Sequence, residues 1–103
     1  MQVEFFTNKI HKDVSNFDIE TQNHVAHLID LLEVYGSEIR MPYSKPIGDG
    51  VFELRAVGKT HVRLLYCFCH GSAIILHILT KKQNKLSNKE ILIAKNRKKQ
   101  LFA

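Results

Sequence analysis

The sequence is poor in cysteine and has no tryptophan: its 103 residues include two thiols, Cys67 and Cys69. So few cysteines exclude the disulfide framework of a small secreted protein. The two thiols stand two positions apart on a predicted strand, where same-face neighbours are too far apart for an unstrained disulfide. The sequence has no Cys-x-x-Cys pair and no second ligand cluster, so we predict no metal site and no cofactor.

Membrane-spanning and exported proteins are also disfavoured. No run of apolar residues approaches the ~20 that cross a bilayer, and the run at residues 73–76 is interrupted by His77. Residues 1–4 lack the basic and apolar regions of a secretory signal. The sequence has no Gly-x-x-x-x-Gly-Lys loop, which excludes that nucleotide-triphosphate signature. We therefore expect a cytoplasmic protein that does not bind a membrane.

Positive charge is abundant, and it is distributed unevenly along the chain. Residues 1–54 carry 4 basic and 9 acidic side chains, whereas residues 55–103 carry 11 basic and 1 acidic. The net charge is +5 and 45% of the residues are hydrophobic, which predicts one globular domain over residues 1–103. The basic half suits a polyanionic partner held on one surface, although a solvated lysine-rich tail would give the same counts.

Hydrophobic spacing predicts a strand and two helices in the first half. Residues 3–6 are typical of a short strand, and Thr7 or Asn8 can cap a short helix after it. Asp18 can cap a second helix that ends at Gly36. Both helices carry apolar residues at helical spacing: Ile10, Val14 and Phe17 on the first, and Val25, Leu28, Ile29, Leu32 and Tyr35 on the second. We expect these helices to form a hairpin with one apolar stripe.

The middle of the chain predicts a loop followed by strands. Residues 41–50 contain both prolines and the turn Gly48-Asp49-Gly50, so they are predicted as a loop. Residues 51–56, 62–69 and 73–80 are predicted as three strands. The connections at Gly58 and at His70-Gly71 are typical of hairpins.

A last helix is predicted from about residue 88 to residue 100. Ser87 and Glu90 have the spacing of a capping box at its start. Three apolar residues can dock it on the sheet: Ile91, Leu92 and Ala94. The expected fold class is α+β, with a helical hairpin and a C-terminal helix packed on a mainly antiparallel sheet of about four strands, in the order β-α-α-β-β-β-α.

The register of the first predicted hairpin places two arginines side by side. Apolar matching sets Leu54 opposite Leu64, and strand parity then puts Arg55 and Arg63 on the sheet face opposite the core. The register of the second hairpin is open. A two-residue turn and a three-residue turn at residues 70–71 put His77 on different faces.

Arg55, Arg63, His77, Lys81 and Lys82 could together carry phosphate chemistry. Guanidinium groups bind phosphate in a bidentate fork and can stabilise a charged transition state. RNA supplies its own nucleophile, the 2′-hydroxyl, so an enzyme needs a base, an acid and cations between them. Lysine serves as a base when neighbouring arginines lower its pKa. The alternative is that these residues only solubilise an exposed strand face.

Residues 42–97 resemble the HigB-like, phage-derived branch of the RelE/ParE toxin superfamily. The resemblance rests on short blocks in a fixed order: Pro-Tyr-Ser-Lys-Pro-Ile-Gly-Asp-Gly at 42–50, Phe-Glu-Leu-Arg at 52–55, Val-Arg-Leu-Leu-Tyr at 62–66, Leu-His-Ile-Leu-Thr-Lys-Lys at 76–82, and Glu-Ile followed by Ala94 and Arg97 in the last helix. The family pattern is not followed at residues 83–87, at Val62 or at Leu79. These departures keep the basic residues of the family pattern but not the residues expected to stack on RNA bases.

The resemblance implies a RelE-like fold and a toxin of a type II toxin–antitoxin module. Such toxins generally cleave mRNA, often at the ribosome, without a metal, and a small helix-turn-helix antitoxin commonly blocks them. Carried over by position, Arg55 and Arg63 would bind the scissile phosphate. Lys81 or Lys82 would act as base or charge stabiliser, and His77 as acid or base. Four lysines would contact the RNA backbone: Lys45, Lys85, Lys95 and Lys98.

Two other functions fit the same sequence. A ParE-like toxin would poison DNA gyrase by binding it, and such a protein would not need His77 beside two lysines. A non-enzymatic module would bind RNA or an antitoxin through phosphate contacts alone, and its RNA affinity would fall with salt while the RNA stayed intact.

Overall fold

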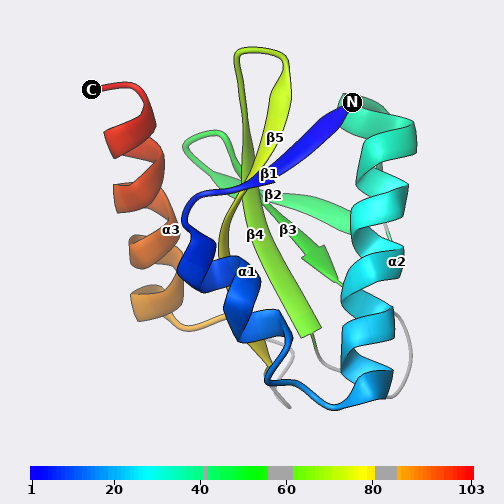
Figure 1. Ribbon diagram of the computed structural model, residues 1–103. Coiled ribbons are helices and arrows are strands. Elements are labelled where there is room, and N and C mark those ends of the chain that lie inside the picture. The colour runs from blue at the N-terminus through cyan, green and yellow to red at the C-terminus, as the bar shows by residue number, and fades with distance from the viewer. Residues whose placement is uncertain (41, 56–61, 81–85) are drawn as a thin grey trace.

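A computed structural model describes residues 1–40, 42–55, 62–80 and 86–103 of the chain (Figure 1). Its elements follow in the order β1 (Gln2–Phe5), α1 (Asn8–Val14), α2 (Ile19–Tyr35), the short 3-10 helix η1 (Gly36–Glu38), β2 (Ser44–Gly48), β3 (Val51–Arg55), β4 (Val62–Cys69), β5 (Ser72–Thr80) and α3 (Asn88–Leu101). Among these residues, no helix combines the length and the apolar character that crossing a membrane requires.

The strands form one mixed sheet in the order β1-β5-β4-β3-β2. β1 pairs with β5 in parallel, and the other three pairings are antiparallel, so the predicted α+β class with a mainly antiparallel sheet is confirmed. The sheet has five described strands where the sequence predicted about four. The additional strand is β2, which lies inside the predicted loop of residues 41–50. Pro46 is tolerated there because β2 is an edge strand, where a missing N–H need not break a ladder.

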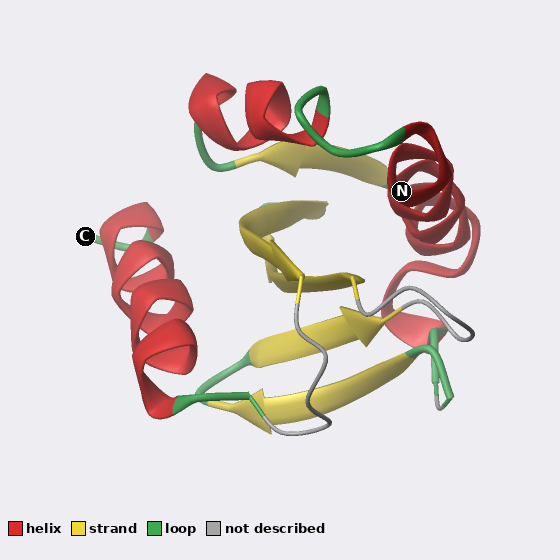
Figure 2. Ribbon diagram, turned by 90° about the horizontal axis from the view of Figure 1, so that it is seen from below, coloured by secondary structure: helices red, strands yellow, loops and turns green. Residues whose placement is uncertain are grey.

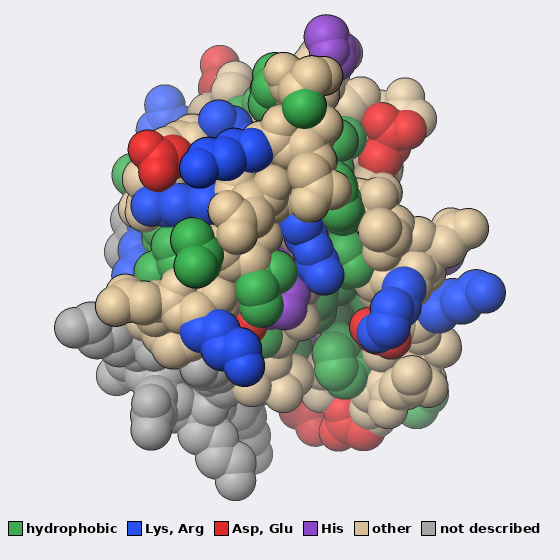
Figure 3. All heavy atoms as spheres, turned by 90° about the vertical axis from the view of Figure 1, so that its left-hand side faces the viewer, with side chains coloured by type: hydrophobic (Ala, Val, Ile, Leu, Met, Phe, Trp, Pro, Cys, Tyr) green, Lys and Arg blue, Asp and Glu red, His purple; other side chains and the backbone are tan. Residues whose placement is uncertain are grey.

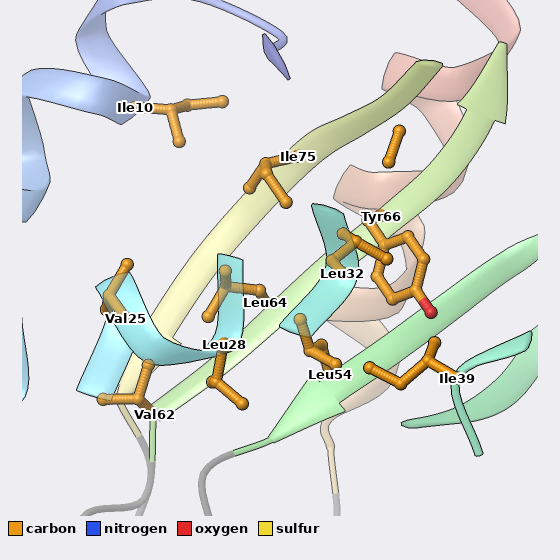
Figure 4. Packing of buried hydrophobic residues seen from close by; sticks show 11 residues of the cluster. Ile10, Val25, Leu28, Leu32, Ile39, Leu54, Val62, Leu64, Tyr66 and Ile75 are labelled. Carbon is orange, nitrogen blue, oxygen red and sulfur yellow. The ribbon is translucent and has the colours of Figure 1, made fainter. Parts of the chain in front are cut away.

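The first hydrophobic core lies between the sheet and helices α1 and α2. Leu54, Leu64 and Tyr66 project from the sheet toward Val25 and Leu28 of α2, as Figure 4 shows. The predicted helix starts are confirmed by the side chains that cap them. Thr7 Oγ1 accepts from the Ile10 amide at 3.3 Å, and Asp18 Oδ1 accepts from the Thr21 amide at 3.1 Å.

A second core fills the opposite face of the sheet, beneath α3. Figure 2 shows α3 on the other side of the sheet from α2. Leu65, Leu76 and Ala94 are fully buried in this second core. Helix α3 therefore covers part of the face opposite the first core. Helix α3 begins after the predicted cap Ser87, but the prediction that Leu92 docks it is wrong, because Leu92 is 57% exposed.

The β4–β5 hairpin determines the site described below. Cys69 pairs with Ser72 across a two-residue turn, in which His70 has φ +51° and Gly71 φ +81°. This is the backbone that hairpin turns of type I′ require. The pairing then shifts by one residue between Leu65 and Tyr66. A β-bulge thus interrupts the ladder in the middle of β5.

Candidate active site

Arg55 and Arg63 are direct cross-strand partners, as the sequence predicted. Leu54 faces Leu64 in the first core, so strand parity directs both arginines toward the α3 side of the sheet. Cα atoms of paired antiparallel residues are about 5 Å apart, which brings two permanent positive charges onto neighbouring strands. The sheet geometry behind the predicted arginine pair is therefore present.

Arg63 is buried rather than exposed. It is 3% exposed, and its Nη1 donates to Glu53 Oε2 at 3.1 Å. Glu53 lies two residues before Arg55 on the same face and is itself fully buried. Taking charges out of water is costly unless they are paired, which is why the guanidinium and the carboxylate adopt this contact. Sequence reasoning missed Glu53 as a site residue, although its strand parity placed it beside both arginines.

Lys45 and Arg55 occupy the more accessible edge of this charged face. Lys45 pairs with Glu53 across β2 and β3, and its Nζ lies 3.9 Å from Glu53 Oε1. Among the described residues, that oxygen has no hydrogen-bond partner. Arg55 is half-buried, and its Nε donates to the Pro42 carbonyl at 3.1 Å. Lys45 and Arg63 thus lie near one carboxylate, and Arg55 adds a third cation to the same face, which leaves the face positively charged.

His77 lies on the same face because of the bulge in β5. Leu65 pairs with His77, whereas the next residue of β4, Tyr66, pairs with Ile75, so Leu76 is the extra residue. Without the bulge, Leu76 would pair with Leu65, and His77 would stand opposite Leu64 and point into the first core. With it, the imidazole lies on the side of the sheet that carries Arg63.

The His77 imidazole is oriented by a carboxylate of α3. Its Nε2 is hydrogen bonded to Glu90 Oε2, and both side chains are about one-fifth exposed, at 19% and 21%. His77 also lines a small pocket of about 140 Å³, together with Arg97 of α3 and residues of α1. Figure 3, which views the molecule from this side, shows a histidine in a hollow among lysine and arginine side chains. The predicted capping-box role of Glu90 is only half realised, since its amide contacts Ser87 Oγ at 3.3 Å while its carboxylate turns to His77.

The predicted lysines fall into two groups. Lys81, Lys82 and Lys85 lie outside the described residues. Lys95 and Lys98 lie on α3, where they line a pocket of about 610 Å³ beside the turn before β3. Lys95 Nζ is 3.2 Å from Asp49 of that turn. Since Asp49 and Arg55 flank opposite ends of β3, these lysines are separated from the arginine pair by the length of that strand.

Neither thiol nor histidine groups form a metal centre in the described part of the chain. No group of three or more His, Cys, Asp or Glu side chains has suitable geometry there. Cys67 and Cys69 are free thiols, and burial raises the pKa of Cys67 to about 11. A thiol that holds its proton is a poor nucleophile and a poor metal ligand. Cys67 instead packs in the second core.

Two of three comparisons with known proteins find a match. The family model described as phage-derived protein Gp49-like (DUF891) matches residues 12–99. Among solved structures, a chain from the toxin–antitoxin complex RelBE2 of Mycobacterium tuberculosis is similar, with a TM-score of 0.53 and 21% identity over 80% of this chain and 92% of that one. No curated protein sequence is a significant match. The likeness to RelBE2 confirms the RelE-like fold that the sequence predicted.

Proposed function

The chain belongs to the phage-derived Gp49-like family, and from that premise we propose that it is the toxin of a type II toxin–antitoxin module. Its proposed activity is that of a metal-independent endoribonuclease acting in the cytosol on mRNA bound to the ribosome. The observation that carries the proposal is the bulge that brings His77 to the sheet face of Arg55 and Arg63. A protein that only bound its target would not need an oriented imidazole on the same sheet face as two arginines.

The fold supports the toxin assignment. The similar solved chain comes from a complex whose two components are a toxin and its antitoxin. The block of residues that led to the HigB-like resemblance also coincides with the charged face, since it contains Lys45, Glu53, Arg55, Arg63 and His77. We propose that a small antitoxin, of helix-turn-helix type, is the partner of this chain.

The charges on the face suit cleavage of a ribose–phosphate link. Arg55 and Lys45 are partly exposed and would contact the scissile phosphate, whose transition state carries additional negative charge. Arg63 would act from beneath, held by Glu53, so that its charge is fixed in place before RNA binds. In this arrangement Arg55 is the more direct phosphate ligand of the two arginines.

Proton transfer is assigned to His77 with Lys81 or Lys82. The 2′-hydroxyl must lose a proton as its oxygen bonds to phosphorus, and the leaving 5′-oxygen must gain one. An imidazole can exchange protons near neutral pH, so His77 is proposed as acid or base. The two lysines are proposed as base or charge stabiliser. Lys45, Lys85, Lys95 and Lys98 are proposed to hold the RNA backbone through salt-dependent contacts.

The test is cleavage of a translated mRNA by the purified chain and by Arg55→Ala. Arg63→Ala is a poor first variant, because it would remove the hydrogen-bonded partner of the buried Glu53 carboxylate and destabilise the protein. Arg40→Ala is the matched control, since Arg40 is an exposed arginine next to η1 and its side chain donates hydrogen bonds to the nearby carbonyls of Ser37 and Ile39. We expect wild type and Arg40→Ala to cleave equally and Arg55→Ala to cleave about 100-fold more slowly.

If the chain inhibits DNA supercoiling by gyrase and leaves mRNA intact, it is instead a gyrase-directed toxin. Salt-sensitive RNA binding with intact RNA would identify a non-enzymatic module. Either result would contradict the proposed activity.

A further inference from the structure

Helix α3 packs on the sheet through Ala94, and a charged residue flanks this contact on each side. Glu90, Ala94 and Arg97 are spaced by four and three residues, so they share one face of the helix. Ala94 is fully buried at the centre of this face, and its small side chain lets the helix backbone approach β5. Glu90 and Arg97 flank that contact and both reach β5.

Arg97 holds the extra residue of the bulge. Its Nη1 donates to the Leu76 carbonyl at 2.6 Å, and its guanidinium lies over the Phe6 ring at 5.7 Å from the ring centre. A bulge places its extra residue outside the regular ladder, so a donor from elsewhere is needed to satisfy the carbonyl. Arg97 therefore stabilises the register in which His77 lies on the face of Arg63.

Glu90 fixes which nitrogen of His77 carries the hydrogen. A carboxylate oxygen can only accept a hydrogen bond, so the imidazole Nε2 that contacts Glu90 Oε2 must be the protonated nitrogen. In the neutral ring, the lone pair then resides on Nδ1. The contact also restricts ring rotation, because both groups are largely enclosed, at 19% and 21% side-chain exposure.

We propose that α3 fixes the position and the tautomer of His77 for catalysis, with Glu90 and Arg97 as positioning residues. The inference rests on the proposed function, in which His77 takes part in proton transfer. Nδ1 accepts the proton of the 2′-hydroxyl while the 2′-oxygen–phosphorus bond forms. The phosphorus–5′-oxygen bond breaks, and the leaving oxygen takes a proton from water or a lysine ammonium. Glu90 and Arg97 act through His77 and do not touch the RNA in this step.

The first readout is the tautomer of His77, observed by long-range ¹H–¹⁵N correlation in the whole chain without RNA. The spectra are recorded under conditions in which the ring nitrogen shifts themselves show the neutral form of His77. We expect Nε2–H in wild type and in Glu90→Gln, because the glutamine amide oxygen still accepts. Glu90→Met fills a similar volume without an acceptor, and we expect a mixture of both tautomers. Wild-type His77 protonated at Nδ1, or an unchanged tautomer in Glu90→Met, would contradict the proposal that Glu90 fixes the tautomer of His77.

The second readout is the cleavage rate of the same variants. We expect Glu90→Met to cleave about 100-fold more slowly than wild type and Glu90→Gln to recover part of that loss. The matched control is Glu20→Met, which removes the other described His–Glu pair, that of His24 and Glu20 on α2. We expect this control to cleave like wild type. Equal rates in all variants would contradict the positioning role.

The two readouts separate this inference from the proposed function. If the wild-type chain does not cleave RNA, the proposed activity fails, yet the tautomer spectra still decide whether Glu90 orients His77.

A third variant, Arg97→Met, tests by hydrogen exchange whether Arg97 stabilises the bulge. We expect faster exchange of the amides in the second half of β5 and no change in α2. Unchanged exchange in β5 would exclude Arg97 as the anchor of the bulge.

Discussion

At the scale of single residues, the site depends on a buried ion pair. Glu53 is fully buried, and Arg63 is 3% exposed with its Nη1 3.1 Å from Glu53 Oε2. Such a pair contributes little beyond an apolar pair of the same size, but losing one member leaves a buried charge without its counter-charge. Its value to the protein is therefore a guanidinium fixed at a defined place on the sheet.

Glu53→Gln tests this pair. The variant keeps the shape of the side chain and removes the charge beside Arg63. We expect the free energy of unfolding, measured with urea, to fall by roughly 3 kcal/mol. Glu38→Gln, at an exposed position in η1, serves as control and should change it by less than about 0.5 kcal/mol. A Glu53→Gln variant as stable as the control would show that the buried charges are not coupled.

Cys67 gives the protein a pH dependence on the alkaline side. Burial raises the pKa of its thiol to about 11, from a value of 9.0 for an accessible thiol. Between these values the unfolded chain loses the Cys67 proton while the folded chain retains it, so rising pH favours unfolding. We expect about 2 kcal/mol of stability to be lost between pH 9 and pH 11. In Cys67→Ala this loss should be smaller, and an equal loss in both proteins would contradict the assignment.

At the scale of elements, local signals predicted helices well and sheet details poorly. The caps Thr7, Asp18 and Ser87 and the turn at His70-Gly71 are encoded within a few residues, and each lies where the sequence placed it. The strand β2 was missed because proline and glycine are compatible with an edge strand as well as with a loop. Its pairing with β3, not its own composition, makes it a strand.

The bulge in β5 could not be predicted for a related reason. Two turn lengths were compatible with the sequence, and they placed His77 on opposite faces of the sheet. The structure has the two-residue turn, and an additional register shift then moves His77 to the other face. That shift coincides with a contact from Arg97, which lies 21 residues away in the chain. A contact at this separation leaves no local signal in the sequence.

Helix α3 depends on its first turn, which carries Glu90. Ser87 Oγ accepts from the Glu90 amide at 3.3 Å, so we expect Ser87→Ala to cost about 1 kcal/mol. Hydrogen exchange should accelerate in the first turn of α3 and not in α2. Asp18→Ala, which removes the corresponding cap of α2, is the control and should show the opposite pattern. Protection of α3 that is unchanged in Ser87→Ala would exclude Ser87 as a stabilising cap.

At the scale of the whole molecule, the sheet separates two differently charged sides. The acidic first half of the chain supplies α1 and α2 on one face, and the basic second half supplies α3 on the other. The uneven charge along the sequence therefore becomes a difference between the two sides of the sheet. Strand parity placed the arginine pair correctly, but the burial of Arg63 was not predicted, because parity does not show how α3 packs over part of that face.

We propose that His77 and the arginines on its sheet face cleave RNA through its own 2′-hydroxyl. The most direct measurement is the chemistry of the new ends, determined by mass spectrometry of mRNA cut by wild type and by His77→Ala. We predict a 2′,3′-cyclic phosphate or its 3′-phosphate hydrolysis product, a 5′-hydroxyl on the other fragment, and about 100-fold less product with His77→Ala. A 3′-hydroxyl end, or equal cleavage by the two proteins, would contradict the account.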